Sequence, residues 1–300
     1  MAMSENKIRI SNSTRLFYAL AFVLVTFIAA ICLIPFILLV SASFSSDHAI
    51  RFYGYSFLPQ EFTLEAYSLI FQYPMRVAQA YGVSIFITVV GTFFGLFLIT
   101  MTAYVISRKT FKFRNGISFY FYFTTLFNGG MVCTYIFYIR YLHLKDSLLA
   151  LILPGMFNVF YLLIMRSFVS QIPQATIESA KIDGAGEFRI FSQIVLPLLP
   201  SGLATIGLFK ALNYWNDWYN AMLYINTQSK FPLQYMLYDL LNRAMALSQI
   251  AAMGGYIMEE LPTYSLKMAM AVVATGPIIL VYPFVQRFFI KGITIGSVKG

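Results

Sequence analysis

Long apolar segments separated by polar ones dominate the pattern of this 300-residue chain. A helix needs about 20 apolar residues to cross the hydrocarbon core of a bilayer. Six uncharged stretches meet or approach that length, and each is predicted to be one membrane-spanning helix. They are Leu16–Ser46, Val77–Ser107, Asn115–Ile139, Ser147–Met165, Ile190–Phe209 and Met268–Gln286. A shorter, partly polar stretch, Ala244–Met258, is predicted to form a re-entrant or outer-surface helix.

The composition agrees with an all-α polytopic membrane protein. Hydrophobic residues make up 59% and charged residues 11% of the chain, against about 45–50% and 25% in soluble domains. The mean hydropathy is +0.71. These values exclude a soluble domain, a disordered chain and a disulfide-stapled secreted fold. The two cysteines, Cys32 and Cys133, lie in apolar runs and are predicted to be small buried hydrophobic residues.

Basic residues are distributed unevenly over the predicted topology. With the N-terminus inside, the inner segments hold 13 Lys and Arg and 4 acidic residues, whereas the outer segments hold 7 of each kind. Because cytoplasmic loops carry the excess of Lys and Arg, both termini are predicted to be cytoplasmic. This topology explains the net charge of +9. The charge is therefore evidence neither for a nucleic-acid partner nor for an acidic substrate.

The second predicted span carries small or hydroxylated residues on one face, within an arc of roughly 60°. Small residues allow helix backbones to approach closely. We therefore favour helix packing for this face, with a pore-lining role as the alternative. The residues are Ser84, Thr88, Gly91, Gly95 and Thr102.

The fifth predicted span carries a polar stripe. Lys210, Asn213, Asp217 and Asn220 share an arc of roughly 80° if one helix continues through all four positions. Ionisable residues at membrane depth usually face a polar interior or a water-filled path. The stripe is interpreted either as part of a solute pathway or as an outer-interface cluster in which Lys210 snorkels inward.

The segment between the fourth and fifth predicted spans is polar and lies on the cytoplasmic side. Pro173 permits a helix start, and 174–182 is predicted to be a short helix. Glycine at 184 and 186 allows a sharp reversal. A second short helix is predicted from Glu187 toward Pro197. Two short helices at a cytoplasmic bend form a knob of the kind that docks into a groove on another protein.

The same segment resembles the EAA loop of ABC-transporter permeases, in which Glu-Ala-Ala is followed at fixed spacing by Gly and by Ile-x-Leu-Pro. Ser179 departs from the pattern, since alanine is usual there. The Asp183-Gly184-Ala185 form is similar to that of sugar permeases, as are Trp215-Asn216-Asp217 and the C-terminal segment. The matching positions are Glu178, Ala180, Gly184, Ile194, Leu196 and Pro197.

The resemblance is to MalG-like carbohydrate permeases, within a subgroup often assigned to complex glycans. It implies a type I ABC importer fold with a cytoplasmic N-terminus at 1–15, a transmembrane domain at 16–300, a coupling loop at 171–197, an outer loop at 224–266 and a cytoplasmic tail at 287–300. It also implies import of an oligosaccharide, with complex or acidic glycans among the expected substrates, across the bacterial cytoplasmic (inner) membrane.

The family's partners are implied as well: a second related permease that completes a heterodimeric pore, two cytoplasmic ATPase subunits that bind ATP and Mg²⁺, and an extracytoplasmic sugar-binding protein. The chain itself has no phosphate-binding loop and is expected not to be an enzyme, with no catalytic or metal site. ATPase coupling is expected at Glu178, Ser179, Ala180, Asp183, Gly184, Ala185, Ile194, Leu196 and Pro197, and at tail residues Gly296, Ser297, Val298, Lys299 and Gly300. The substrate pathway is expected at Lys210, Asn213, Tyr214, Trp215, Asn216, Asp217 and Asn220.

Three alternatives stay open on the sequence. The first is an ABC importer for another solute class, such as a peptide. The second is an ion-coupled secondary transporter, although no half-chain repeat of the usual kind is visible. The third is a membrane enzyme, although no HExxH or GxSxG constellation is present.

Overall fold

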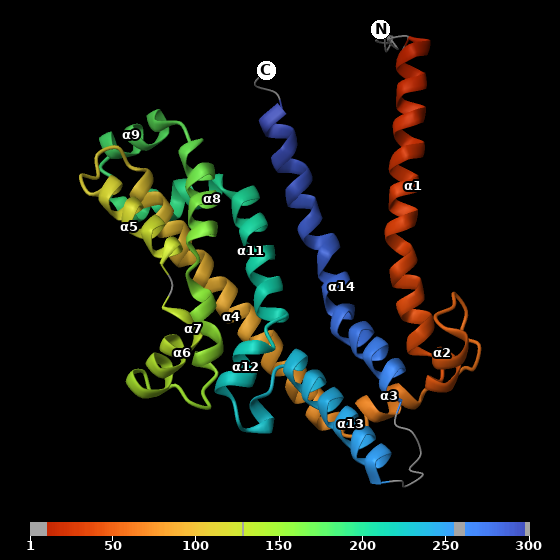
Figure 1. Ribbon diagram of the computed structural model, residues 1–300. Coiled ribbons are helices and arrows are strands. Elements are labelled where there is room, and N and C mark those ends of the chain that lie inside the picture. Colours follow the sequence, from red (N-terminus) through yellow and green to blue (C-terminus); the bar gives the residue numbers. More distant parts are fainter. Residues whose placement is uncertain (1–10, 128, 255–261, 298–300) are drawn as a thin grey trace. The chain divides into compact units, whose positions relative to one another are not determined.

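The computed structural model describes residues 11–127, 129–254 and 262–297 (Figure 1). The chain divides into two compact units. One contains residues up to Leu69 together with Leu247–Val273, and the other contains Ile70–Ala246 together with the chain from Ala274 onward. The described residues are helical throughout, apart from loops and one isolated antiparallel bridge between Ser45 and Phe62.

The first unit begins with a long apolar helix. Its α-helices are α1 (Asn12–Ser43), α2 (Asp47–Tyr53) and α3 (Glu65–Ile70, whose last residue belongs to the second unit). Two further helices, α13 (Leu233–Gly254) and α14 (Thr263–Ser297), have residues in both units.

The second unit contains the remaining elements. In chain order they are α4 (Pro74–Ser107), α5 (Arg114–Leu126), α6 (Gly130–Ile136), a π-helix (Phe137–Tyr141), α7 (Leu149–Met156), α8 (Val159–Ser170), α9 (Gln174–Ile182), α10 (Glu187–Ile190), a second π-helix (Phe191–Val195), a 3-10 turn (Leu196–Leu198), α11 (Pro200–Trp215), α12 (Tyr219–Tyr224) and a 3-10 turn (Gln228–Lys230).

Three helices of the described chain are long and apolar enough to cross a membrane, and five spans result if each of two bent helix pairs is counted as one. The three are α1, α4 and the Thr263–Leu280 part of α14. They confirm the first, second and sixth predicted spans as helices. The two bent pairs are α7 with α8, and the Glu187–Leu198 segment with α11.

The other three predicted spans are not single straight helices. Asn115–Ile139 is split between α5 and α6, where Gly130 has a φ of +79° that favours glycine. Ser147–Met165 bends by 50° between α7 and α8. Ile190–Phe209 bends by 83° before Pro200, because proline lacks an N–H and disfavours helical geometry at the preceding Leu199.

Two smaller expectations also change. The described part of Ala244–Met258 is not a separate helix but continues α13, and residues 255–258 lie outside the described part of the chain. Cys32 and Cys133 are exposed rather than buried. Both lie on apolar helices, and in a bilayer an uncovered apolar face contacts lipid or another subunit.

The core of the second unit lies where α4, α8, α11 and the segment around α10 pack together. Its fully buried side chains interdigitate in one cluster, and α9 joins the cluster through Ile177 and Ala180. The loop that precedes α11 is therefore attached to the membrane-embedded helices by apolar packing. The cluster includes Ile99, Ala103, Leu162, Met165, Ile190, Val195 and Ile206.

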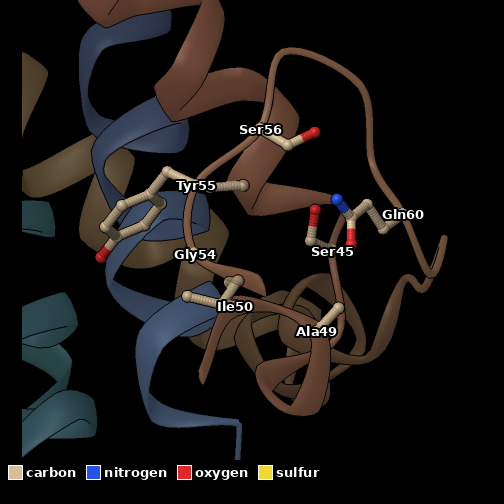
Figure 2. Close-up of a pocket in the computed structure, with 8 residues that line it drawn as sticks. Ser45, Ala49, Ile50, Gly54, Tyr55, Ser56 and Gln60 are labelled. Carbon is tan, nitrogen blue, oxygen red and sulfur yellow. The ribbon is translucent and has the colours of Figure 1, made fainter. Parts of the chain in front are cut away.

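In the first unit, a buried carboxylate holds the start of α14. Asp47, on α2, accepts hydrogen bonds from the Ser265 N–H and hydroxyl, both at 2.8 Å, and from the Tyr264 N–H at 3.0 Å. The first N–H groups of a helix have no partner within the helix, and a negative charge there is favourable. Asp47 thus acts as an N-terminal cap supplied from elsewhere in the chain. A hollow beside α2, lined by Ala49, Ile50 and Gly54 (Figure 2), has a volume of about 10 Å³, which is room for roughly one water.

Removing the Asp47 carboxylate is expected to destabilise the protein. Asp47→Ala leaves buried N–H groups without an acceptor, at a cost of about 2–3 kcal/mol. The matched control is Asp239→Ala, which breaks a partly exposed ion pair with Arg243 one turn away on the same helix and is expected to cost about 0.3–0.5 kcal/mol. Thermal unfolding of the detergent-solubilised protein, followed by fluorescence, measures both. Equal midpoints for the two variants would contradict the capping role.

Candidate functional site

A polar cleft of about 440 Å³ opens in the second unit where α7, α8, α11 and α12 meet. Six of the seven residues predicted to line a substrate pathway line this cleft. The lining residues are Pro154, Gly155, Asn158, Tyr161, Lys210, Leu212, Asn213, Tyr214, Asn216, Asp217 and Asn220.

Lys210 is almost completely buried, with 1% of its surface exposed. Its ammonium donates to the Gly155 carbonyl at 2.6 Å and to the Met156 carbonyl at 3.0 Å. These are the last carbonyls of α7, which have no partner within the helix and carry the negative end of its dipole. The interpretation in which Lys210 snorkels to water is therefore wrong, because its charge is held in the interior.

Two further α11 side chains hold the break between α7 and α8. The Tyr214 hydroxyl donates to the Ile152 carbonyl on α7 at 2.7 Å, and the Asn213 amide donates to the Tyr161 hydroxyl on α8 at 2.8 Å. At the break itself, the Asn158 side chain caps α8 by accepting from the Phe160 N–H at 2.9 Å. One face of α11 thus fixes both halves of the bent span.

Glycines make room for these long side chains. A Cβ on Gly91 would lie 2.5 Å from a ring carbon of Tyr214, and one on Gly95 would lie 2.5 Å from Nζ of Lys210. A Cβ on Gly155 would lie 2.8 Å from the Tyr214 ring. Such distances are steric overlaps, so α4 and α7 approach α11 this closely only because these positions lack side chains. The packing interpretation of the small face on the second span is confirmed at Gly91 and Gly95.

The polar stripe does not lie on one helix, contrary to the prediction. α11 ends at Trp215, and Asn220 lies on α12. Asp217 stands in the break, where it accepts from the Asn220 N–H at 3.0 Å and from the Asn220 amide at 2.7 Å. An aspartate that caps the following turn interrupts a helix rather than continuing it. The cleft still brings Asp217 and Asn220 together with α11.

Trp215 is the predicted pathway residue that does not line the cleft. It is buried, and its indole N–H donates to the Ala274 carbonyl on α14 at 2.9 Å. Trp215 therefore contacts α14, within the second unit, rather than the cleft.

The loop that resembles the EAA motif forms two helical segments around a sharp turn, as predicted. α9 ends at Ile182, and Gly184 follows with a φ of +78°. The Ala185 N–H then donates back to the Ala180 carbonyl at 2.9 Å. α10, the second π-helix and the 3-10 turn continue through Leu196 and Pro197, which confirms the predicted second helical stretch.

The two faces of this loop differ in exposure. Ile177 and Ala180 are buried in the core cluster, whereas Glu178, Ser179 and Asp183 are exposed. Two large apolar side chains also lie open, Ile182 at 86% and Phe188 at 68% exposure. Within the second unit, α9 lies at one end and α6, α7 and α12 lie toward the other (Figure 1).

The comparisons with known proteins agree with the motif. No protein-family model matches the chain. Protein LplC of Bacillus subtilis is 41% identical over 275 residues, covering 91% of each chain. The polygalacturonan/rhamnogalacturonan transport system permease protein YtcP of the same organism is 40% identical over 287 residues, covering 95% of this chain and 99% of the relative. A solved bacterial ABC transporter that imports the acidic polysaccharide alginate matches with a TM-score of 0.74 and 29% identity, over 93% of this chain and 99% of that one.

The chain belongs to the carbohydrate ABC-transporter permeases. It is a multi-pass protein of the bacterial cytoplasmic membrane. Its relatives are transport subunits rather than enzymes. We therefore interpret the sequence as a carbohydrate permease, in place of the ion-coupled transporter and the membrane enzyme that were left open above.

Sequence reasoning missed one anchor of the permease's loop. Glu187, at the start of α10, accepts from the Lys181 ammonium and from the Tyr104 hydroxyl, each at 2.5 Å. The Arg108 guanidinium lies 3.9 Å from the same carboxylate. Glu187 therefore joins α9 and α10 to the end of α4. The only sequence signal is a lysine and a glutamate flanking the glycine turn, which does not identify the α4 partners.

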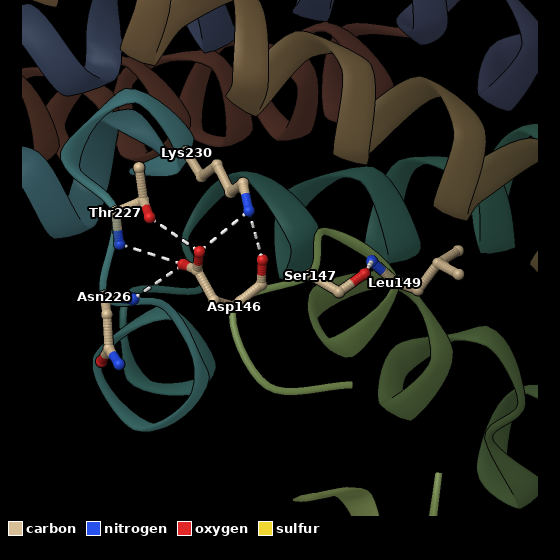
Figure 3. A network of polar contacts seen from close by, with 6 residues as sticks. All are labelled: Asp146, Ser147, Leu149, Asn226, Thr227 and Lys230. Atoms are coloured by element: carbon tan, nitrogen blue, oxygen red, sulfur yellow. Dashed lines mark hydrogen bonds and ion pairs between the residues drawn. The ribbon is translucent and has the colours of Figure 1, made fainter. Parts of the chain in front are cut away.

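A second missed network joins two loops of the permease (Figure 3). Asp146 accepts from the Lys230 ammonium at 2.9 Å, and from the Thr227 hydroxyl at 2.7 Å and N–H at 3.0 Å. The Lys230 ammonium, followed by Thr227, holds the pKa of the Asp146 carboxyl well below its ordinary value. The clamp is therefore intact at neutral pH and is lost only in strong acid. It ties the loop before α7 to the loop after α12.

The predicted ATPase contact of the tail falls largely outside the described structure. α14 extends through Gly296 and Ser297, and Val298, Lys299 and Gly300 lie outside the described residues.

Replacing the packed glycines is expected to destabilise the permease, whereas replacing an open one on the same helix is not. Gly95→Ala overlaps Lys210 and should cost about 1–3 kcal/mol. Gly82→Ala, also on α4, meets nothing within 4 Å and should stabilise by about 0.5–1 kcal/mol. Thermal unfolding in detergent compares the two variants. A stabilised Gly95→Ala variant would contradict the close packing described.

Proposed function

We propose that this permease forms one half of a heterodimeric pore in an ATP-driven importer for an oligosaccharide. The second half is a related permease, and an extracytoplasmic binding protein delivers the sugar. We assign six spans to the chain, with both termini cytoplasmic. The uneven distribution of Lys and Arg supports this orientation, and the family membership supports the assembly.

The observation that carries the coupling role is the two-faced loop around Gly184. One face is packed into the core through Ile177 and Ala180, and the other exposes Ile182 and Phe188. Large apolar side chains on a water-facing loop favour a protein partner. We assign this surface to two cytoplasmic ATPase subunits, where ATP and Mg²⁺ bind and hydrolysis takes place.

We infer a mechanical route from the loop to the cleft. Displacement of α9 and α10 moves Glu187, which is bonded to Tyr104 near the end of α4. α4 is an unbroken helix of 34 residues, so it transmits motion along its length with little bending. Further along the same helix, Gly95 and Gly91 contact Lys210 and Tyr214 beside the cleft. Closure of the ATPases would therefore change the packing around the cleft.

The cleft has properties that suit a sugar. Its volume of about 440 Å³ falls within the range of roughly 300–1,000 Å³ typical of small-ligand sites. Asn158, Asn216 and Tyr161 line it with groups that donate and accept hydrogen bonds. YtcP is named for the transport of polygalacturonan or rhamnogalacturonan, and the solved neighbour is involved in the import of alginate. We carry over to this chain the class of substrate that these two share, a complex glycan in oligosaccharide form.

The assembly is tested by purifying the tagged chain from its native membrane in mild detergent. We expect a second six-span permease and an ATPase to co-purify in stoichiometric amounts. A chain that purifies alone or as a homodimer after gentle crosslinking would contradict the heterodimeric importer. An untagged strain carried through the same purification identifies background proteins.

The coupling role is tested by Gly184→Val. A β-branched residue at a φ of +78° is strained by about 1–3 kcal/mol, so the turn should rearrange. We expect ATP hydrolysis by the complex to continue while sugar uptake falls by about tenfold. Gly186→Val is the matched control, because Gly186 has a φ of −68° and open space around it. Wild-type uptake by the Gly184 variant would contradict the coupling role.

A further inference from the structure

Lys210 has no carboxylate partner among the residues that the structure describes. Its ammonium has three N–H donors, and two of them are used on the Gly155 and Met156 carbonyls. Asp217 lines the same cleft, but its two oxygens accept from Asn220. A formal positive charge therefore stands at the wall of the cleft without an opposite charge paired to it.

The surroundings of Lys210 offset this charge only in part. The end of α7 contributes about half a negative charge, and the rings of Tyr214 and Tyr161 lie with centroids 5.6 and 6.0 Å from Nζ. Because little water screens charges at membrane depth, the remaining positive potential extends into the cleft. A ligand that brings an anion into the cleft is therefore favoured over a neutral ligand of the same size.

A structural clamp alone does not require a charge at this position. Tyr214 holds the neighbouring Ile152 carbonyl of the same helix with a neutral hydroxyl at 2.7 Å. Lys210 and Tyr214 are one turn apart on the same face of α11, so the chain places a neutral and a charged donor side by side for the same task. The charged donor carries a desolvation cost that the neutral one avoids. That cost is recovered when an anion enters the cleft.

We propose that the cleft selects oligosaccharides that carry carboxylate groups, and that the positive charge of the buried Lys210 side chain, which helps to line the cleft, attracts the carboxylate. This inference rests on the proposed function, because it requires the sugar to pass through the cleft. Asn158 and Asn216 contribute amides that suit the hydroxyls of the same sugar ring. Asp217 opposes an anion, so the balance between Lys210 and Asp217 sets the preference for charged over neutral sugars.

The test compares oligogalacturonates with their methyl esters, which share the same sugar backbone but lack the charge. ATP-dependent uptake is measured in proteoliposomes that contain the whole importer and its binding protein. Because the binding protein is the same in every sample, the change in the acid-to-ester uptake ratio between variant and wild type reports on the permease. Lys210→Gln is expected to lower that ratio by about tenfold.

Asp217→Asn provides an independent test, because it leaves the bonds from Lys210 to the last carbonyls of α7 in place. Asparagine still caps the turn at Asn220, while the negative charge is removed from the cleft. The ratio is then expected to rise by about threefold or more. An unchanged or lowered ratio in this variant would overturn the proposal, even where Lys210→Gln fails to assemble.

The remaining outcomes separate this inference from the proposed function. An equal fall for both probes in Lys210→Gln would show that Lys210 is a clamp only. If the wild-type importer takes up the esters or neutral maltotriose but not the acids, the carboxylate preference is overturned. Oligosaccharide import is then left standing. A complex that takes up no sugar in an ATP-dependent manner would instead contradict the proposed function itself.

Discussion

The arrangement around the cleft depends on one constraint, which is that backbone carbonyls at a break in a membrane-embedded helix must find donors without help from water. The break between α7 and α8 leaves such carbonyls at Gly155 and Met156, and Lys210 satisfies both. This contact fixes the position of α11 against α7. It also places a charge at the wall of the cleft, so the same bond determines the structure and the electrostatics of the site.

Two distant parts of the permease are joined by α4. Near its C-terminal end, Tyr104 bonds to Glu187 and so to the loop around Gly184. Nearer the middle of α4, Gly91 and Gly95 lie against Tyr214 and Lys210. A single unbroken helix therefore contacts both the loop around Gly184 and the cleft, whereas the α7–α8 pair is bent by 50°. The contrast between a rigid element and a bent one is the physical basis of the proposed route for coupling.

The sequence predicts local features of this permease well and non-local ones poorly. The turn at Gly184 follows from the glycine itself, and α1 and α4 follow from uninterrupted apolar runs. The bend before Pro200 and the break at Asn158 were not predicted, because hydropathy counts apolar residues and does not register how proline and caps redirect a helix. The cleft residues were found because polar groups are rare in apolar runs. Glu187 and Asp146 were missed because their partners lie far away in the sequence.

The glycines beside the cleft also constrain how this protein can evolve. Gly91, Gly95 and Gly155 leave no room for a methyl group while Lys210 and Tyr214 keep their length and position. A larger residue at one of these sites is tolerated only if its neighbour becomes smaller, and a smaller residue at 210 or 214 would open a void and release the α7 carbonyls. Substitutions in this set are therefore epistatic. Across permeases that share the bend, these five positions are expected to vary as a correlated group rather than independently.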